Sequence, residues 1–139
     1  MDEKTFIRDV ARRVACDEGR AEALVFAVFQ ELRERLTPKE ASHVAAQMPY
    51  ALKKLWTSDE KVDRPVRRIH AEQFIGEVRK IAALPDEAEA RRAVVAVFGE
   101  LQKMLGSPDG MEGEAWDIMA QLPKDLKKMW LEAAGRGPE

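Results

Sequence analysis

The sequence has one cysteine, few aromatic residues and no long apolar segment. Cys16 is the only cysteine among 139 residues, so no disulfide can form within the chain and we expect a reducing compartment. No apolar run approaches the roughly 20 residues that a membrane-spanning helix requires. The N-terminus MDEKTFIRDV is charged and lacks the apolar region of a signal peptide. These absences predict a cytoplasmic protein that does not enter a membrane.

Neither sign of charge dominates the sequence. The chain has 23 Lys and Arg residues against 25 Asp and Glu residues, for a net charge of −2. The chain as a whole therefore does not attract nucleic acid or an anionic membrane. Charged residues make up 35% of the chain, above the usual value of about 25%. This excess is typical of helices with long solvated faces.

One segment of the chain occurs twice. Residues 45–56 read AAQMPYALKKLW, and residues 119–130 read MAQLPKDLKKMW. The earlier part of each half also repeats, because AVFQEL at 27–32 returns as AVFGEL at 96–101. Internal similarity of this kind predicts two like units that bury their apolar faces against one another.

A ridge of apolar residues predicts a long helix in the first half. Its members recur at helical intervals: Leu24, Val28, Leu32 and Leu36. We expect Asp17 to cap the start of this helix and the helix to end near Leu36. Arg33, Glu34 and Arg35 fall mostly on the side that we expect to face solvent.

Capping signals and prolines predict shorter helices after the long one. Thr37-Pro38-Lys39-Glu40 has the pattern of a capping box with proline in the first turn. Pro49 and Pro123 interrupt the helices that contain them, so each is expected to start a short fourth helix. We expect Gln47 and Gln121 to bond carbonyls released by these breaks; ligand binding is the alternative.

These patterns predict an all-α fold. We expect two sequence-related four-helix halves packed as a compact pseudo-two-fold helical bundle, with two tethered four-helix units as the alternative. The predicted boundaries are a first repeat at 1–57, a linker at 58–72, a second repeat at 73–132 and a frayed tail at 133–139.

The paired segments resemble an uncharacterised, mainly bacterial family called domain of unknown function 2267, over about residues 4–131. In the first half the resemblance rests on Phe6, Val10, Phe29, Leu32, Leu36, Gln47, Pro49, Leu52 and Trp56. In the second half it rests on Phe74, Val78, Phe98, Leu101, Leu105, Gln121, Pro123, Leu126 and Trp130. The resemblance implies a duplicated all-helical unit, and it carries no activity that could be transferred.

The aromatic residues of the motif have a structural interpretation. Trp56 and Trp130 stand at helical spacing from Leu52 and Leu126, so we expect each indole to close the core of its half. Stacking on a ligand or a partner is the alternative. Phe26 departs from the apolar pattern of its helix and is predicted to meet the other half or a partner.

No group of residues predicts catalysis, a cofactor or a metal site. Cys16 has the apolar Leu84 as its counterpart in the second half, which favours an inert, buried thiol. His43 and His70 are isolated and do not have the spacing of metal ligands. We therefore expect no enzyme activity, with a site drawn from both halves as the least favoured hypothesis.

Two functional hypotheses follow. The first is a non-enzymatic module for protein interaction, as a homo-oligomer or with another protein. The second is binding of nucleic acid, phosphate or an acidic partner by a basic face from the linker and the fourth helices. The residues of that face are Lys53, Lys54, Arg64, Arg67, Arg68, Lys127 and Lys128.

Overall fold

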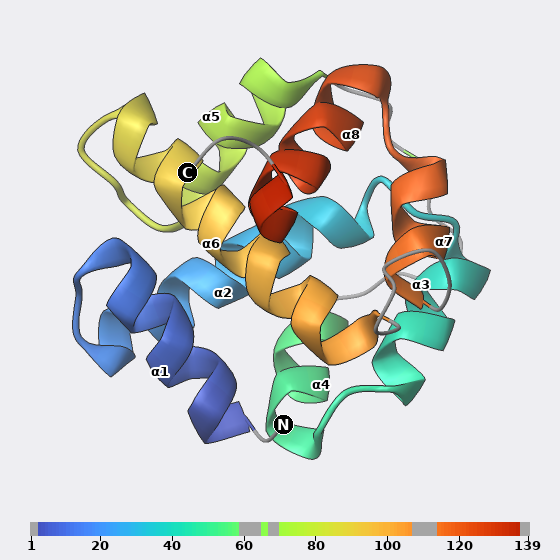
Figure 1. Cartoon of the computed structure of the whole chain (residues 1–139), viewed down its shortest axis with the longest axis horizontal. Helices are drawn as coiled ribbons and strands as arrows, with labels where there is room; N and C mark the ends of the chain where they lie inside the picture. Colours follow the sequence, from blue (N-terminus) through green and yellow to red (C-terminus); the bar gives the residue numbers. More distant parts are fainter. Residues whose placement is uncertain (1–2, 59–64, 67–69, 107–113, 137–139) are drawn as a thin grey trace.

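A computed structural model of the chain describes residues 3–58, 65–66, 70–106 and 114–136, and over these residues the protein is all-helical, as predicted (Figure 1). The helices are α1 (Glu3–Val14), α2 (Glu18–Arg33), α3 (Pro38–Ala46), α4 (Tyr50–Thr57), α5 (Ala71–Ile81), α6 (Glu87–Leu105), α7 (Glu114–Gln121), α8 (Lys124–Leu131) and the π-helical turn η1 (Glu132–Arg136). Among these elements there is no helix with the length and apolar character needed to cross a membrane.

The two long helices begin at aspartate caps. The Asp17 carboxylate accepts a 2.7 Å hydrogen bond from the backbone N–H of Arg20. The Asp86 carboxylate accepts a 2.9 Å bond from the N–H of Glu89 in the same way. Each cap satisfies a backbone donor that has no partner inside the helix. The predicted cap at Asp17 is therefore confirmed.

Alanines in the left-handed conformation end α1 and α5. Ala15 has φ 56° and Ala83 has φ 52°. The next residue of each chain segment bonds the carbonyl five positions earlier, at 3.0 Å for Cys16 and 2.9 Å for Leu84. This is the Schellman arrangement, in which glycine is the usual left-handed residue. Both turns bring α1 and α5 back onto the helix that follows.

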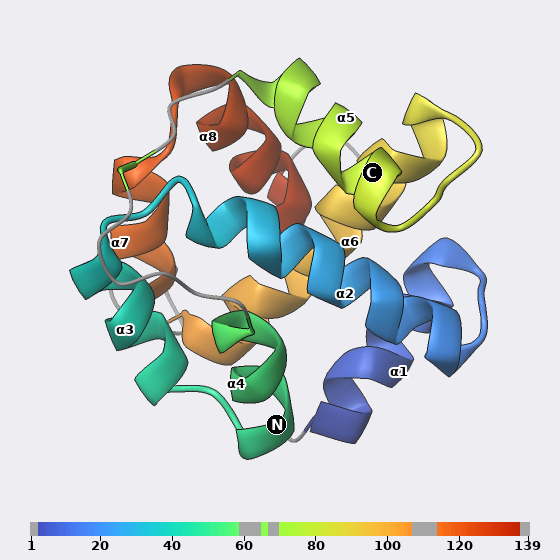
Figure 2. The ribbon, with the colours of Figure 1, turned by 180° about the vertical axis from the view of Figure 1, so that it is seen from behind.

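The helices α2 and α6 occupy the centre of the molecule and contact each other (Figures 1 and 2). The first helix of each half packs on both of them: α1 contacts α2 and α6, and α5 contacts α6 and α2. One hydrophobic core includes buried residues from both halves. The alternative of two tethered four-helix units is therefore wrong.

Three aromatic rings contact one another in series in the core of the first half, in tilted and edge-to-face arrangements. The Phe29 ring lies 6.0 Å from that of Phe6 and 5.4 Å from that of Trp56, measured between ring centroids. The indole N–H of Trp56 donates a 2.9 Å bond to the carbonyl of Ala41. Rings of the second half make the corresponding contacts, at 5.8 Å and 4.9 Å: Phe74, Phe98 and Trp130.

Both prolines of the repeated segment lie at helix breaks, as predicted. Pro49 is the residue before α4, and Pro123 is the residue before α8. Their carbonyls accept 2.9 Å bonds from the N–H groups of Lys53 and Lys127. The side chains of Leu52 and Leu126 are fully buried in these two short helices, beside the core tryptophans.

The C-terminal end of α2 differs from the prediction. The helix ends at Arg33 rather than near Leu36, and the Arg33 side chain is buried, with 3% of its surface exposed. Its Nη1 donates to the carbonyls of Trp56 at 2.8 Å and Ser58 at 2.7 Å. Arg33 does not face solvent because it bonds carbonyls at the end of α4, where no further helical turn satisfies them.

Arg35 is also buried rather than solvated, with 1% of its surface exposed. Its Nη1 donates to the carbonyl of Glu31 at 2.8 Å and to the Glu31 carboxylate at 3.0 Å. The guanidinium carbon lies 5.0 Å from the centre of the Phe74 ring in α5. These contacts compensate for the loss of water around the guanidinium charge. Arg35 is therefore buried, although its charged sequence neighbourhood predicts a solvent-facing side chain.

The predicted frayed tail is partly wrong. Residues 132–136 form η1, which packs on α6 and on α8, and Ala133 is buried. The absence of a side chain at Gly99 allows this packing, because a Cβ there would lie 2.9 Å from the Ala133 carbonyl oxygen. Arg91 of α6 also pairs with Glu132 at 3.3 Å. Residues 137–139 lie outside the described part of the chain.

Candidate functional site

Four of the seven residues of the predicted basic face lie in described helices, on two separate elements. Lys53 and Lys54 lie in α4, and Lys127 and Lys128 lie in α8. In both views α4 and α8 lie at opposite edges of the molecule, with α2 and α6 between them (Figures 1 and 2). Lys54 Nζ lies 5.4 Å from the centre of the exposed Tyr50 ring. The other three residues of the predicted basic face lie outside the described residues: Arg64, Arg67 and Arg68.

Phe26 lies outside the hydrophobic core. Its side chain is partly exposed, and it belongs neither to the buried cluster nor to the partly buried residues packed against that cluster. Its counterpart 69 residues later, Val95, does pack against the core. The predicted contact of Phe26 with the other half or with a partner stays a prediction.

Gln121 has a different role from the one expected. Its Oε1 accepts a 3.1 Å bond from the backbone N–H of Thr37, and its Nε2 donates a 3.3 Å bond to the Glu40 carboxylate. The Thr37 hydroxyl accepts from the Glu40 N–H at 3.1 Å, as the capping box predicts. The reciprocal bond to Thr37 comes from Gln121 instead of Glu40. Gln121 therefore joins the end of α7 to the start of α3, while Gln47 has an exposed side chain.

Sequence patterns did not reveal a buried ionic cluster between α1 and α6. Glu100 is fully buried, and its Oε2 lies 2.8 Å from Arg13 Nε and 3.4 Å from Lys103 Nζ. The repeated AVF-x-EL segment has a glutamate at the same position in both halves, and this recurrence could have indicated a buried acidic residue. The matching Glu31 is buried as well. The two cations balance the Glu100 charge, so the arrangement supports packing of α1 on α6.

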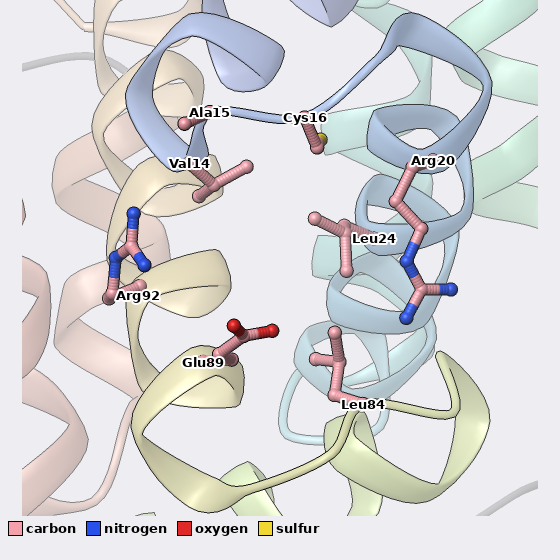
Figure 3. Close-up of a pocket in the computed structure, with 8 residues that line it drawn as sticks. All are labelled: Val14, Ala15, Cys16, Arg20, Leu24, Leu84, Glu89 and Arg92. Carbon is pink, nitrogen blue, oxygen red and sulfur yellow. The ribbon is translucent and has the colours of Figure 1, made fainter.

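A cavity lies between the turn that joins α1 to α2 and the turn that joins α5 to α6 (Figure 3). Its volume is about 150 Å³. Val14, Leu24 and Leu84 form apolar walls, and the Cys16 side chain stands beside them. Sequence reasoning missed this site because its two halves are about 70 residues apart and meet only when α1 packs across the second half.

The thiol beside the cavity is held in its protonated form. Burial raises the pKa of Cys16, the charge of Asp17 raises it further, and the Arg20 guanidinium lowers it. Since the thiolate is the nucleophile, a raised pKa makes this cysteine a poor one. The raised pKa therefore gives no indication that Cys16 is an activated nucleophile.

The two histidines lie apart from any metal-binding group in the described part of the chain. Among the residues with described positions, no three His, Cys, Asp or Glu side chains are arranged to hold a metal ion. His70 Nδ1 lies 3.5 Å from Asp125 Oδ2, and the same oxygen accepts a 2.8 Å bond from the Ala71 N–H. Asp125 thus caps the start of α5 from α8.

A comparison with models of protein families identifies the family of this chain. The model of the family described as Uncharacterized conserved protein (DUF2267) matches residues 3–129. The chain belongs to the DUF2267 family. No curated protein matches the chain. DUF2267 is an uncharacterised family, so membership supports no specific role.

The DUF2267 match extends from α1 into α8 and includes the first copy of the repeated segment and residues 119–129 of the second. All residues that line the cavity lie within it, as does the Arg13–Glu100 pair. The turn η1 follows the matched residues.

Proposed function

We propose that this DUF2267 protein is a non-enzymatic, cytoplasmic interaction module that self-associates through α2. Phe26 carries the proposal. It is a large apolar side chain, partly exposed and outside the core, on a helix whose other large apolar side chains are buried. Ala23, Phe26 and Gln30 follow one another at helical spacing on one face, and none of them is fully buried. Figure 2 views the molecule from the side on which α2 lies in front.

A second copy of the chain is the partner that this face fits. A single helix face can pair with itself across a two-fold axis, which is the commonest symmetry of soluble oligomers. In such a pair the two Phe26 rings would lie near the axis and be removed from water together. Burial of apolar surface contributes about 25 cal/mol per Å², and aromatic residues are enriched at the centres of interfaces.

We also propose that the two halves of the chain are related by a pseudo-two-fold axis. Three observations support this relation. The packing of α1 on α6 has a counterpart in the packing of α5 on α2. The aromatic rings of the core contact one another in the same order in both halves. The left-handed alanines Ala15 and Ala83 end corresponding helices.

Size-exclusion chromatography with light scattering over a range of concentrations tests self-association. The chain has a mass of 15.7 kDa, and we expect the wild type to approach twice that value as concentration rises. Phe26→Glu should remain a monomer, since it places a charge at the proposed axis. Tyr50→Glu is the matched control, because Tyr50 is 76% exposed on another helix; this variant should dimerise like the wild type. A wild type that is monomeric at every concentration overturns the proposal.

The nucleic-acid or phosphate hypothesis has weaker support. The helices α4 and α8 lie at opposite edges of the molecule, which does not favour one continuous basic face formed by their lysines. Anisotropy titration of a nucleic acid at low salt tests binding by the α4 lysines, with Lys53→Glu and Lys54→Glu as variants. Unchanged binding in these variants would exclude α4 as the contact surface.

A further inference from the structure

The cavity between the α1–α2 turn and the α5–α6 turn has two unlike walls (Figure 3). Leu24 and Leu84 lie on one side. Val14, Glu89 and Arg92 lie on the opposite side, the last two in the first turns of α6, and in Figure 3 the Glu89 carboxylate points into the cavity. A volume of about 150 Å³ is about five times the roughly 30 Å³ that one water occupies in the liquid. The cavity can therefore hold a short branched aliphatic group.

The polar wall presents one anion and one cation. Within the part of the chain that the structure describes, neither the Glu89 carboxylate nor the Arg92 guanidinium has a hydrogen bond or an ion pair. Arg20, in contrast, donates to the Ala83 carbonyl at 3.2 Å, and in Figure 3 its guanidinium points away from α6. The charges available to a ligand are therefore those of Glu89 and Arg92.

We propose that this cavity binds a small aliphatic α-amino acid. The ligand carboxylate pairs with Arg92, its ammonium group pairs with Glu89, and its side chain lies between Leu24 and Leu84. A zwitterion with an apolar side chain matches both walls at once. A simple carboxylate could pair with Arg92 alone and a simple amine with Glu89 alone, and the other exposed charge would stay hydrated. The site is independent of the proposed self-association.

Cys16 provides a readout that is specific to the cavity. It is the only cysteine in the chain and it lines the cavity, so the rate of reaction with a thiol reagent reports on this site alone. At a ligand concentration of three times Kd, about three quarters of the sites are occupied and labelling slows about fourfold if the occupied form is protected. The measurement is made at mildly alkaline pH, because burial raises the pKa of the thiol.

Four compounds separate the contributions of the ligand groups. L-leucine carries all three groups, 4-methylpentanoate lacks the ammonium, 3-methylbutylamine lacks the carboxylate, and glycine lacks the side chain. We expect L-leucine to protect Cys16 in a saturable manner. Each of the other three should bind about tenfold more weakly, as expected for loss of one charge-assisted bond or of the apolar contact.

Substitutions of the two exposed charged residues test which group of the ligand each residue binds. Arg92→Gln should weaken L-leucine about tenfold and leave 3-methylbutylamine unchanged, whereas Glu89→Gln should weaken L-leucine and leave 4-methylpentanoate unchanged. Arg91→Gln is the matched control on the same helix, and it should bind like the wild type. Amide chemical shifts in α6, recorded with each compound, provide a second measurement. The proposal is overturned if L-leucine neither protects Cys16 nor shifts these amides, or if glycine binds as well as L-leucine.

Discussion

Arg13 of α1 lies 2.8 Å from the fully buried carboxylate of Glu100 in α6. Removal of the cation leaves a buried charge with reduced compensation, which costs about 3–5 kcal/mol for a fully buried pair. The Arg13 side chain is 34% exposed, and Lys103 stays 3.4 Å from Glu100. We therefore expect Arg13→Ala to lower the free energy of unfolding by about 2 kcal/mol, measured by urea denaturation. Arg12→Ala, at an exposed neighbouring position, should change it by less than about 0.5 kcal/mol; equal effects would show that the pair is dispensable.

Gly99 and Gly76 should respond in opposite ways to replacement by alanine. A Cβ at Gly99 would lie 2.5 Å from Arg13 Nη1 and 2.9 Å from the Ala133 oxygen, whereas nothing lies within 4 Å of one at Gly76. We expect Gly99→Ala to destabilise the protein by about 1–3 kcal/mol through overpacking. Gly76→Ala, inside α5, should stabilise it by about 0.5–1 kcal/mol. Thermal unfolding of both variants checks the difference in sign, and stabilisation by Gly99→Ala would mean that η1 does not pack closely on α6.

The left-handed alanines predict a gain of stability. Ala15 and Ala83 have φ values of 56° and 52°, a region that glycine enters without a steric penalty. Replacement of either by glycine should raise the free energy of unfolding by about 1 kcal/mol. Ala23→Gly, at an exposed position inside α2, should instead lower it by about 1 kcal/mol. Chemical denaturation of the three variants tests this, and a loss in all three would rule out strain at the turns.

The pKa of Cys16 predicts how reactivity and stability depend on pH. Burial raises this pKa above its ordinary value, so the midpoint of alkylation rate against pH should lie above that of an unfolded control peptide. Asp17→Asn keeps a capping oxygen and should lower the midpoint, whereas Arg20→Gln should raise it.

The direction in which the free energy of unfolding changes with pH follows from proton binding by Cys16. The folded state holds the thiol proton to higher pH than the unfolded state does. This contribution to stability is therefore complete below the ordinary thiol pKa and decreases as pH rises through the raised one. A Cys16→Ser variant, whose hydroxyl does not titrate there, should lack this part of the pH dependence. A wild-type midpoint equal to that of the peptide would contradict the burial of the thiol.

Local patterns predicted the elements of the fold well. Asp17, Pro38 and the two motif prolines mark helix starts that the structure contains. These signals depend on backbone donors and on the φ restriction of proline, which neighbouring residues alone determine. The all-α class could therefore be read from residues close together in the chain.

Residues that act between distant helices could not be assigned in this way. Arg33 and Arg35 have the composition of a solvated surface, and they are buried because carbonyls of α4, Glu31 and the Phe74 ring surround them. Gln121 was expected to act at its own helix break and instead caps α3 from α7. Such roles depend on which helix lies opposite, and side-chain periodicity contains no information on that.

The packing of α1 across the second half has a consequence for synthesis on the ribosome. The side of α1 that carries Arg13 packs on α6, which ends at Leu105. At about 5–20 residues per second, roughly 5–18 s pass between the emergence of Val14 and that of Leu105. During this interval the side of α1 that later packs on α6 has no partner helix from the second half.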